Sequence, residues 1–399
     1  MEGTRHIIAG SLIDGNGDGV QRNVCLTVTD GRIAAIGPAD EIPTAAGAIV
    51  DDYSYGIILP ALVDCSVFLA RSPSLDGQVR SAAGADPTQQ AALLARHLRY
   101  CHSHGVLGVA EGDDLAGMLR QHPPAGQGAG GASVRLAAAP SADGGSAAIV
   151  IPTGGDYLRI QYTAGIADAA VPSPRLGPDD LRSLLRQRGG RKAVVVANGR
   201  QAVAEALAAG CDAIEQGYGM GGENVRTMAA QGVLWIPGLL LAKNALDGAG
   251  SGGDVCCRFS QRYVAPGTPV PGAEAFWKKT LADQLGLLRQ AGEAGVKTAI
   301  GTGAGSPGIL HGESVVEEMK LFIKAGWSLA ATIRCASAEG AEFFGMDGLG
   351  RLAVGKGATF LVARGAVQQL PRKLAYLEAI YIDGAPSPAY CKNPVKTAM

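Results

Sequence analysis

The chain has 399 residues, of which 47% are hydrophobic and 18% charged, a composition typical of a globular protein with a large core. Its 35 basic and 36 acidic side chains leave a formal net charge of −1, and like charges form no long block. This balance argues against nucleic acids and anionic membrane surfaces as partners.

Compartment is indicated by what the sequence lacks. The first residues, MEGTRHIIAG, do not form a charged-then-apolar leader. No uncharged apolar run approaches the roughly 18 residues that a membrane span needs. The eight cysteines are scattered and none has C-x-x-C spacing, which favours buried, reduced thiols over a disulfide framework or a metal site. We therefore expect a cytoplasmic protein without a membrane segment.

The first 58 residues predict a small β-domain without a helix. Ile7-Ile8-Ala9-Gly10 and Leu12-Ile13-Asp14-Gly15 indicate a strand, a turn and a second strand. The alternating run Val24–Val28 leads to Asp30-Gly31, a hairpin signal, and Arg32–Gly37 is its expected partner.

From about Leu59, apolar strand-like runs alternate with helical stretches, which predicts βα units around a parallel sheet. The expected strands are Ala61–Val63, Gly105–Ala110, Val134–Ala139, Tyr157–Gln161, Ala193–Ala197, Ala213–Glu215, Val233–Ile236 and Thr298–Gly301. The expected helices are Pro87–His102, Pro178–Arg188, Gln201–Ala209, Asn224–Gln231, Ala273–Ala294 and Ser314–Ala325. Eight strands match a closed (β/α)8 TIM barrel.

Four stretches rich in Gly, Ala, Pro and Ser indicate mobile loops, at residues 121–133, 140–148, 246–254 and 265–272. Strand patterns return at Ala358–Ala363 and Ala379–Asp383. A β-rich tail after a barrel needs a hydrogen-bond partner, and the β-rich N-terminus is the simplest one. The predicted architecture is therefore α/β, with a barrel over 59–347 and a small β-sandwich-like domain formed by 1–58 and 348–399.

Four motifs together resemble one family. Ile58-Leu59-Pro60-Ala61-Leu62-Val63-Asp64-Cys65 enters the first barrel strand, and Ala206–Gly217 covers the sixth-strand region. Gly301–Gly305 with His311-Gly312-Glu313 covers the eighth strand and its loop, and Leu349–Ala358 the return to the β-domain. The chain is similar to the amidohydrolase superfamily, especially its imidazolonepropionase-like and Xaa-Pro dipeptidase-like members, over essentially its whole length.

That resemblance implies a metal, which polarises a carbonyl and activates water for amide hydrolysis. The usual ligands are His-x-His after strand one, a carboxylated Lys on strand four, one His each on strands five and six, and an Asp on strand eight that also acts as general base. The positions that match these ligands here are Ser66 and Phe68, Arg159, Asn198, Gln216 and Gly303.

These side chains are unsuited to the implied chemistry. Phe68 and Gly303 offer no ligand atom, and neutral Ser66, Asn198 and Gln216 are weak partners for a transition metal. Arg159 cannot be carboxylated and keeps its charge. We therefore expect no metal, no cofactor and no general base at Gly303.

Other residues near the expected site have bland alternatives. His102-Ser103-His104 looks like a metal pair but lies at a helix end before Gly105, where capping is the simpler interpretation. His311 follows strand eight and is either a loop-packing residue or a ligand contact. Cys65 is expected to be a buried structural thiol. Asp64 and Glu215 are expected to bond the backbone or to pair with Arg159.

The sequence leaves three functions open. The first is a metal-free barrel that binds a ligand or a protein partner without the ancestral chemistry. The second is a metal-independent hydrolase of carbon–nitrogen bonds that uses Arg159, Asn198, Gln216 and His311, where an arginine and two amides would stabilise an oxyanion. The third is a metallohydrolase with ligands from other positions. A homo-oligomer is compatible with all three.

Arg159 decides the kind of pocket. A buried guanidinium needs a partner, because leaving it unpaired costs several kcal/mol. If Asp64, Glu215 or Asp156 pairs with it, the old metal cavity is a filled core. If none does, the natural partner is a small anionic or carbonyl-bearing ligand, with Asn198 and Gln216 beside it.

Overall fold

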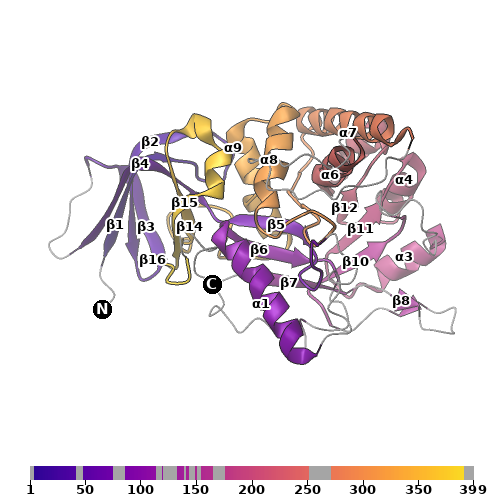
Figure 1. Ribbon diagram of the computed structural model, residues 1–399, viewed down its shortest axis with the longest axis horizontal. Coiled ribbons are helices and arrows are strands. Elements are labelled where there is room, and N and C mark those ends of the chain that lie inside the picture. Colours follow the sequence, from indigo (N-terminus) through magenta and orange to yellow (C-terminus); the bar gives the residue numbers. More distant parts are fainter. Residues whose placement is uncertain are drawn as a thin grey trace.

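In the computed structural model, described over residues 4–41, 48–74, 86–113, 119, 133–138, 141–142, 149–150, 154–164, 176–250 and 271–390, both chain ends form one sheet beside a barrel (Figure 1). Of the loops expected at 121–133, 140–148, 246–254 and 265–272, residues 121–132, 140, 143–148, 251–254 and 265–270 lie outside the described residues, as do Cys256, Cys257 and Cys391. Among the described helices, none is long and apolar enough to cross a membrane.

The sheet of the chain ends has the strand order β16-β15-β14-β4-β1-β2-β3. Its strands are β1 (Arg5–Leu12), β2 (Gln21–Thr29), β3 (Arg32–Pro38), β4 (Ile49–Pro60), β14 (Phe360–Arg364), β15 (Leu377–Ile382) and β16 (Ala385–Pro386). The C-terminal β14 pairs antiparallel with the N-terminal β4, from Phe360 against Pro60 to Arg364 against Gly56. The expected pairing of the two chain ends is therefore confirmed, and the division near residues 58 and 347 stays a prediction.

Local chemistry shapes this sheet. Asp30 (φ +50°) and Gly31 (φ +73°) form the expected two-residue turn between β2 and β3, since both occupy the left-handed region. The predicted break at Gly10 is wrong, because β1 runs unbroken to Leu12. A bridge between Arg32 and Gly357 joins the β3 edge to the segment before β14. The sheet therefore curls around its own core, which includes Ile7, Leu26 and Phe360.

The barrel contains seven assigned parallel strands in the order β5-β6-β7-β10-β11-β12-β13, each at an expected position. They are β5 (Leu62–Val67), β6 (Val106–Glu111), β7 (Ser133–Ala138), β10 (Tyr157–Gln161), β11 (Ala193–Ala197), β12 (Ala213–Gln216) and β13 (Leu234–Ile236). Two further strands, β8 (Ser141–Ala142) and β9 (Ile149–Val150), form a separate antiparallel pair.

The expected eighth strand, Thr298–Gly301, is not assigned as a strand but closes the barrel through its backbone. Ala299 N donates to Trp235 O at 2.9 Å on the β13 side, and Cys65 N donates to Ile300 O at 2.8 Å on the β5 side. Two glycines, Gly301 and Gly303, stand in or beside this segment, and glycine weakens regular strand structure.

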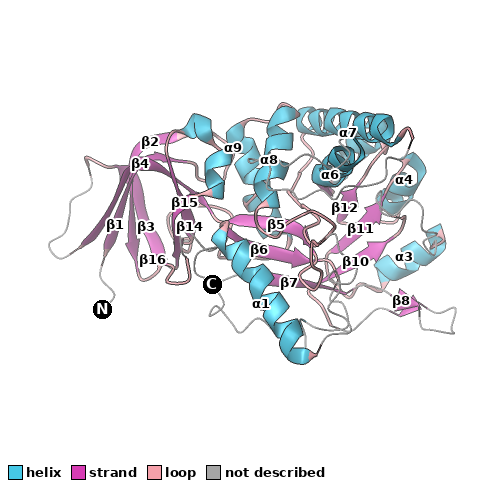
Figure 2. Ribbon diagram, viewed as in Figure 1, coloured by secondary structure: helices cyan, strands magenta, loops and turns pink. Residues whose placement is uncertain are grey.

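Helices cover the outside of the barrel (Figure 2). They are α1 (Pro87–Ser103), α3 (Pro178–Arg186), α4 (Arg200–Ala208), α5 (Gly221–Gln231), α6 (Leu239–Gly250), α7 (Ala273–Ala294), α8 (Ser314–Lys324), α9 (Leu329–Cys335) and α10 (Ala338–Phe343). Two short 3₁₀ turns, η3 (Val367–Gln369) and η4 (Arg372–Ala375), precede β15. The loop predicted at 246–254 is wrong over its first part, because α6 extends to Gly250.

The barrel interior is a packed core. Val63, Tyr157, Val194 and Ile236 point inward and pack together, with Phe344 after α10 at one end. The expected site residues lie at the opposite end, where the parallel strands finish.

Candidate functional site

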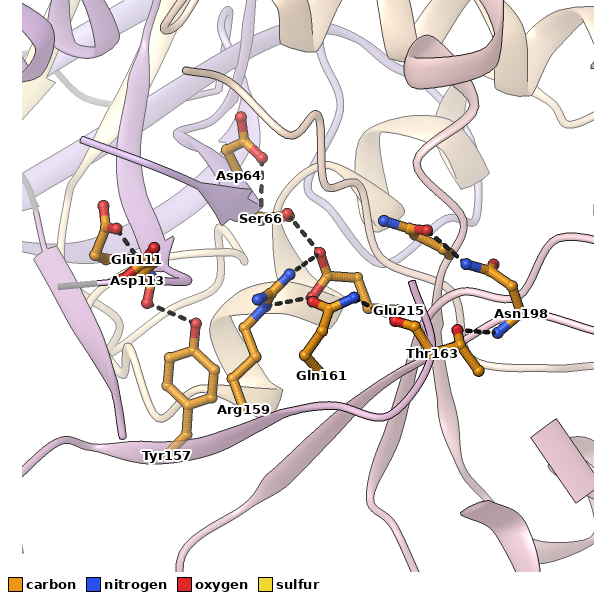
Figure 3. Close-up of polar contacts among 11 residues, drawn as sticks. Asp64, Ser66, Glu111, Asp113, Tyr157, Arg159, Gln161, Thr163, Asn198 and Glu215 are labelled. Atoms are coloured by element: carbon orange, nitrogen blue, oxygen red, sulfur yellow. Dashed lines mark hydrogen bonds and ion pairs between the residues drawn. The ribbon is translucent and has the colours of Figure 1, made fainter. Parts of the chain in front are cut away.

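The positions singled out in the sequence do meet at the carboxyl ends of the strands. Ser66 lies near the end of β5, Arg159 in β10, Asn198 directly after β11 and Gln216 at the end of β12. Barrels place their functional loops at this end, because every strand finishes there. Figure 3 shows polar contacts of Ser66, Arg159 and Asn198 with their neighbours.

The centre of the site is an ion pair between Arg159 and Glu215. Arg159 Nε donates to Glu215 Oε2 at 2.7 Å and Nη2 donates to Oε1 at 2.9 Å, which is a bidentate arrangement. The two side chains are only 11% and 6% exposed. Burial by itself would lower the pKa of Arg159, but the charge and hydrogen bonds of Glu215 raise it above its ordinary value. The guanidinium is therefore a permanent cation whose partner is internal.

Ser66 completes this centre. Its hydroxyl donates to Glu215 Oε1 at 2.8 Å, so one carboxylate joins the ends of β5, β10 and β12 (Figure 3). Of the two outcomes left open for Arg159, the structure has the internal one, with Glu215 as the partner. Because Glu215 already neutralises Arg159, the charge of Arg159 no longer favours an anionic ligand at this position.

Asp64 connects β5 to the segment that closes the barrel. Its carboxylate accepts from Thr302 N at 2.9 Å and from Thr302 Oγ1 at 2.5 Å. Complete burial raises the pKa of Asp64 to about 7, although the contacts with Thr302 and Ser66 act in the opposite direction. Asp64 is thus a seam residue, as one of the sequence interpretations held.

Asn198 and Gln216 bond to each other at the ends of β11 and β12. Asn198 Nδ2 donates to Gln216 Oε1 at 2.8 Å, and Asn198 Oδ1 accepts from Tyr218 N at 2.9 Å. The backbone of Asn198 donates to Thr163 Oγ1 at 3.0 Å. Asn198 Nδ2 also donates to Ala164 O at 3.1 Å, so the side-chain N–H groups of Asn198 are used within the fold and are not available to an oxyanion.

Phe68 fills the space beside the ion pair. The Arg159 guanidinium lies 5.4 Å from its ring centroid and that of Arg71 lies 4.7 Å away, within the range of cation–π contacts. Arg71 forms an ion pair with Asp113. A Cβ at Gly112 would come within 3.0 Å of Phe68 Cε1 and 3.2 Å of Arg159 Nε, so a larger residue there would have to displace one of these side chains slightly.

Gly303, at the position of the family's general base, has φ +72°. A Cβ built there would lie 3.2 Å from Leu241 Cδ2. Backbone conformation and the neighbouring leucine of α6 both disfavour an aspartate here.

His311 is buried, with 2% exposure, and its ring stacks on His97 with centroids 3.9 Å apart. His311 Nε2 contacts Phe68 O at 3.2 Å and His97 Nδ1 contacts Leu69 O at 2.7 Å, so the two rings hold the chain after β5. Desolvation and the neighbouring His97 lower the pKa of His311, and desolvation lowers that of His97 to about 4. The arrangement matches the loop-packing interpretation of His311.

The remaining candidates are structural. His104 caps the end of α1, and its backbone N–H reaches the carbonyls of Tyr100 and Cys101. His102 is buried and its Nε2 lies 3.0 Å from Ser387 Oγ. Cys65 is free and buried, and desolvation raises its pKa. Within the described ranges, no three His, Cys, Asp or Glu side chains gather in a way that could hold a metal ion.

The sequence reasoning missed four contributors: Glu111, Tyr157, Thr302 and His97. Glu111 Oε2 accepts from Leu69 N at 2.5 Å, and its backbone oxygen accepts from the Tyr157 hydroxyl at 2.8 Å. Each lies on an expected strand or helix, or directly after one, but only the closed barrel brings them to one place. A polar residue at the end of an apolar strand was the one signal available for Glu111.

Comparison with known proteins places this geometry in a wider group. The model of the amidohydrolase family matches residues 169–389. A solved Xaa-Pro dipeptidase with bound methionine in its active site is 22% identical, with a TM-score of 0.76 over 96% of this chain and 99% of that one. A putative prolidase from Bifidobacterium longum is 21% identical, with a TM-score of 0.73 over 96% and 94%.

A third similar structure is the ochratoxinase of A. niger, 17% identical, with a TM-score of 0.74 over 96% of this chain and 95% of that one. At these identities the structures demonstrate a shared fold and no more. No curated protein sequence matches the chain.

Proposed function

The chain belongs to the amidohydrolase family. We propose that, within this family, it is a metal-free barrel that acts by binding a small ligand or a protein partner, without the family's metallohydrolase chemistry. The observation that carries the proposal is the bidentate Arg159–Glu215 pair. The Arg159 guanidinium stands at a position where the family has a metal-binding side chain, and it binds the carboxylate of Glu215.

A transition metal does not fit these residues. A divalent cation beside Arg159 would meet a permanent like charge in a buried setting, where such repulsion is expensive. Glu215, the available carboxylate, is already engaged by Arg159 and Ser66. The amides of Asn198 and Gln216 are bonded to each other. No catalytic step through a metal is therefore derived for this chain.

The experiment is a metal analysis of protein purified without chelators, before and after dialysis against zinc, manganese and cobalt salts. We expect substoichiometric metal and no metal-stimulated hydrolysis of Xaa-Pro dipeptides or N-acyl amino acids. The matched control is a similar Xaa-Pro dipeptidase prepared in parallel. One equivalent of tightly held transition metal, lost when Glu215→Gln is introduced, would overturn the proposal.

One contact favours the alternative of a metal-independent hydrolase of carbon–nitrogen bonds. The Ser66 hydroxyl lies 2.8 Å from Glu215 Oε1, within the distance at which a carboxylate takes a proton from a nucleophile. Arg159 opposes this role, because its two hydrogen bonds already occupy both carboxylate oxygens of Glu215. Fluorophosphonate labelling decides the matter: a covalent adduct at Ser66, absent in Ser66→Ala, supports hydrolysis, and an unlabelled Ser66 supports binding alone.

A further inference from the structure

A cavity lies at the end of the barrel opposite the candidate site. It has a volume of about 300 Å³, and its lining includes Lys192, Asp212, Leu234, Lys297 and Phe343. Lys192 precedes β11, Asp212 precedes β12, and Leu234 begins β13. The cavity is therefore on the face where the parallel strands begin, a strand's length away from Arg159 and Glu215.

The charges of this cavity are unequal in how firmly they are held. Three carboxylates line it, and each has an arginine partner outside the lining. Arg188 lies 3.0 Å from Asp212, Arg334 Nε donates to Glu339 at 2.5 Å, and Arg351 lies 3.4 Å from Glu342. Asp212 also accepts from the backbone of Ala193 at 2.8 Å. Asp212 and Glu339 are thus held by close contacts that do not involve the two lysines, whereas Glu342 lies 3.4 Å from Arg351 and 3.7 Å from Lys297.

Lys192 and Lys297 are held more loosely. Lys192 Nζ is 3.4 Å from Asp212 and Lys297 Nζ is 3.7 Å from Glu342, and the lysine side chains are 56% and 53% exposed. Pairs of this length and exposure contribute little energy and exchange partners readily. Lys192 therefore supplies positive charge that Asp212, already paired with Arg188, does not need, and Lys297 can exchange its long contact with Glu342 for one with a ligand.

One wall of the cavity is aromatic. Lys192 Nζ lies 5.7 Å from the centroid of the Phe343 ring, which packs edge-on against Phe344 at 4.8 Å. Leu234 and Val233 add apolar surface. A ligand site typically combines such an apolar wall with a few polar groups, and about 300 Å³ is the lower end of the usual size.

We propose that this cavity binds a small organic anion, an aromatic carboxylate or phosphate monoester whose charge lies between Lys192 and Lys297 and whose ring lies against Phe343. The assignment deepens the proposed binding function, because it gives the ligand a site that does not require Arg159. It rests on the cavity, the close pairing of Asp212 and Glu339 with arginines, and the two loosely held lysines.

The test is calorimetric titration of the full chain with phenyl phosphate and with benzoate, and with benzyl alcohol as the uncharged control. We expect binding of at least one anion and none of the alcohol. Lys192→Met and Lys297→Met should each weaken binding about ten-fold, which is the loss of about 1.4 kcal/mol. The matched control, Lys279→Met, removes an exposed lysine from α7 and should leave binding unchanged.

Three results would overturn the inference: neither anion binds, all three lysine variants bind equally, or Arg159→Met abolishes binding while both cavity variants retain it. The last result would return the ligand to the barrel mouth. Metal content is measured on the same samples, so failure of the anion site is distinguishable from failure of the metal-free proposal. A bound metal with a working anion site would overturn only the latter.

Discussion

Removing one partner of the Arg159–Glu215 pair should cost far more stability than removing both. Both side chains are almost fully buried and share two hydrogen bonds of 2.7 and 2.9 Å. Glu215→Gln would leave a buried guanidinium facing a neutral amide. Breaking a buried pair in this way typically costs about 3–5 kcal/mol. The same loss is expected for Arg159→Met, which would remove both guanidinium hydrogen bonds from the buried Glu215 side chain.

The double variant Arg159→Met/Glu215→Leu removes both charges and replaces them with apolar groups of similar size. Such replacements are often neutral or stabilising, so the double variant should recover most of the loss. Urea denaturation of the wild type, Arg159→Met, Glu215→Leu and the double variant measures the coupling energy, because the single and double variants then carry the same substitutions. An exposed pair, Arg182 and Asp179, provides the control, and Arg182→Met should cost less than about 1 kcal/mol. Single variants that each cost under about 1 kcal/mol would refute the view of Arg159 as an internally paired cation.

Three further results follow from the structure. The stability difference between the wild type and His97→Gln should depend on pH, because the pKa of His97 in the folded protein is about 4, below its ordinary 6.5. As pH falls from about 6.5 to about 4, the wild type should lose about 3 kcal/mol relative to the variant, measured by urea denaturation at each pH. A stability difference that does not change with pH would contradict this. Gly112→Ala should destabilise the protein by about 1–3 kcal/mol in thermal melts, because the new Cβ would lie 3.0 Å from Phe68. The control, Gly286→Ala in α7, has nothing within 4 Å of its Cβ and should stabilise the protein by about 0.5–1 kcal/mol. Similar effects of the two substitutions would show that the Phe68 contact is unimportant. The Glu318 carboxyl accepts from the first two backbone N–H groups of α6 at 2.8 and 2.7 Å. Glu318→Gln should therefore cost about 1.5–3 kcal/mol and reduce the protection of the first α6 amides from hydrogen exchange. Unchanged protection of these amides would reject the capping role of Glu318.

Much of the architecture could be predicted from pattern alone. The seven assigned barrel strands lie at expected positions, and α7 matches its expected bounds, Ala273–Ala294. Period-2 and period-3.6 hydrophobicity carry this information locally, so no knowledge of distant contacts is needed. The end of α6 was predicted as a loop because it contains Gly248 and Gly250, and packing on the barrel overrides the weak helix preference of glycine.

The candidate site divides differently. Which residue types stand at the ends of the strands is a property of the sequence, and Ser66, Arg159, Asn198 and Gln216 could be named without a structure. Their chemistry already argued against a metal. The partner of Arg159 could not be predicted, because the sequence pattern is compatible with Asp64, Asp156 or Glu215.

Tertiary structure made that choice. Arg159 and Glu215 are 56 residues apart, and only the parallel order β10-β11-β12 and the barrel's curvature bring their side chains to bidentate contact. Asp64 does not pair with Arg159, because its carboxylate accepts from both the backbone N–H and the hydroxyl of Thr302 in the segment that closes the barrel. The cavity at the opposite face was equally invisible in the sequence, because its lysines and aromatic ring come from separate elements. Sequence determines which groups are present at each strand end; the distances that decide which charges neutralise each other arise only when the barrel closes.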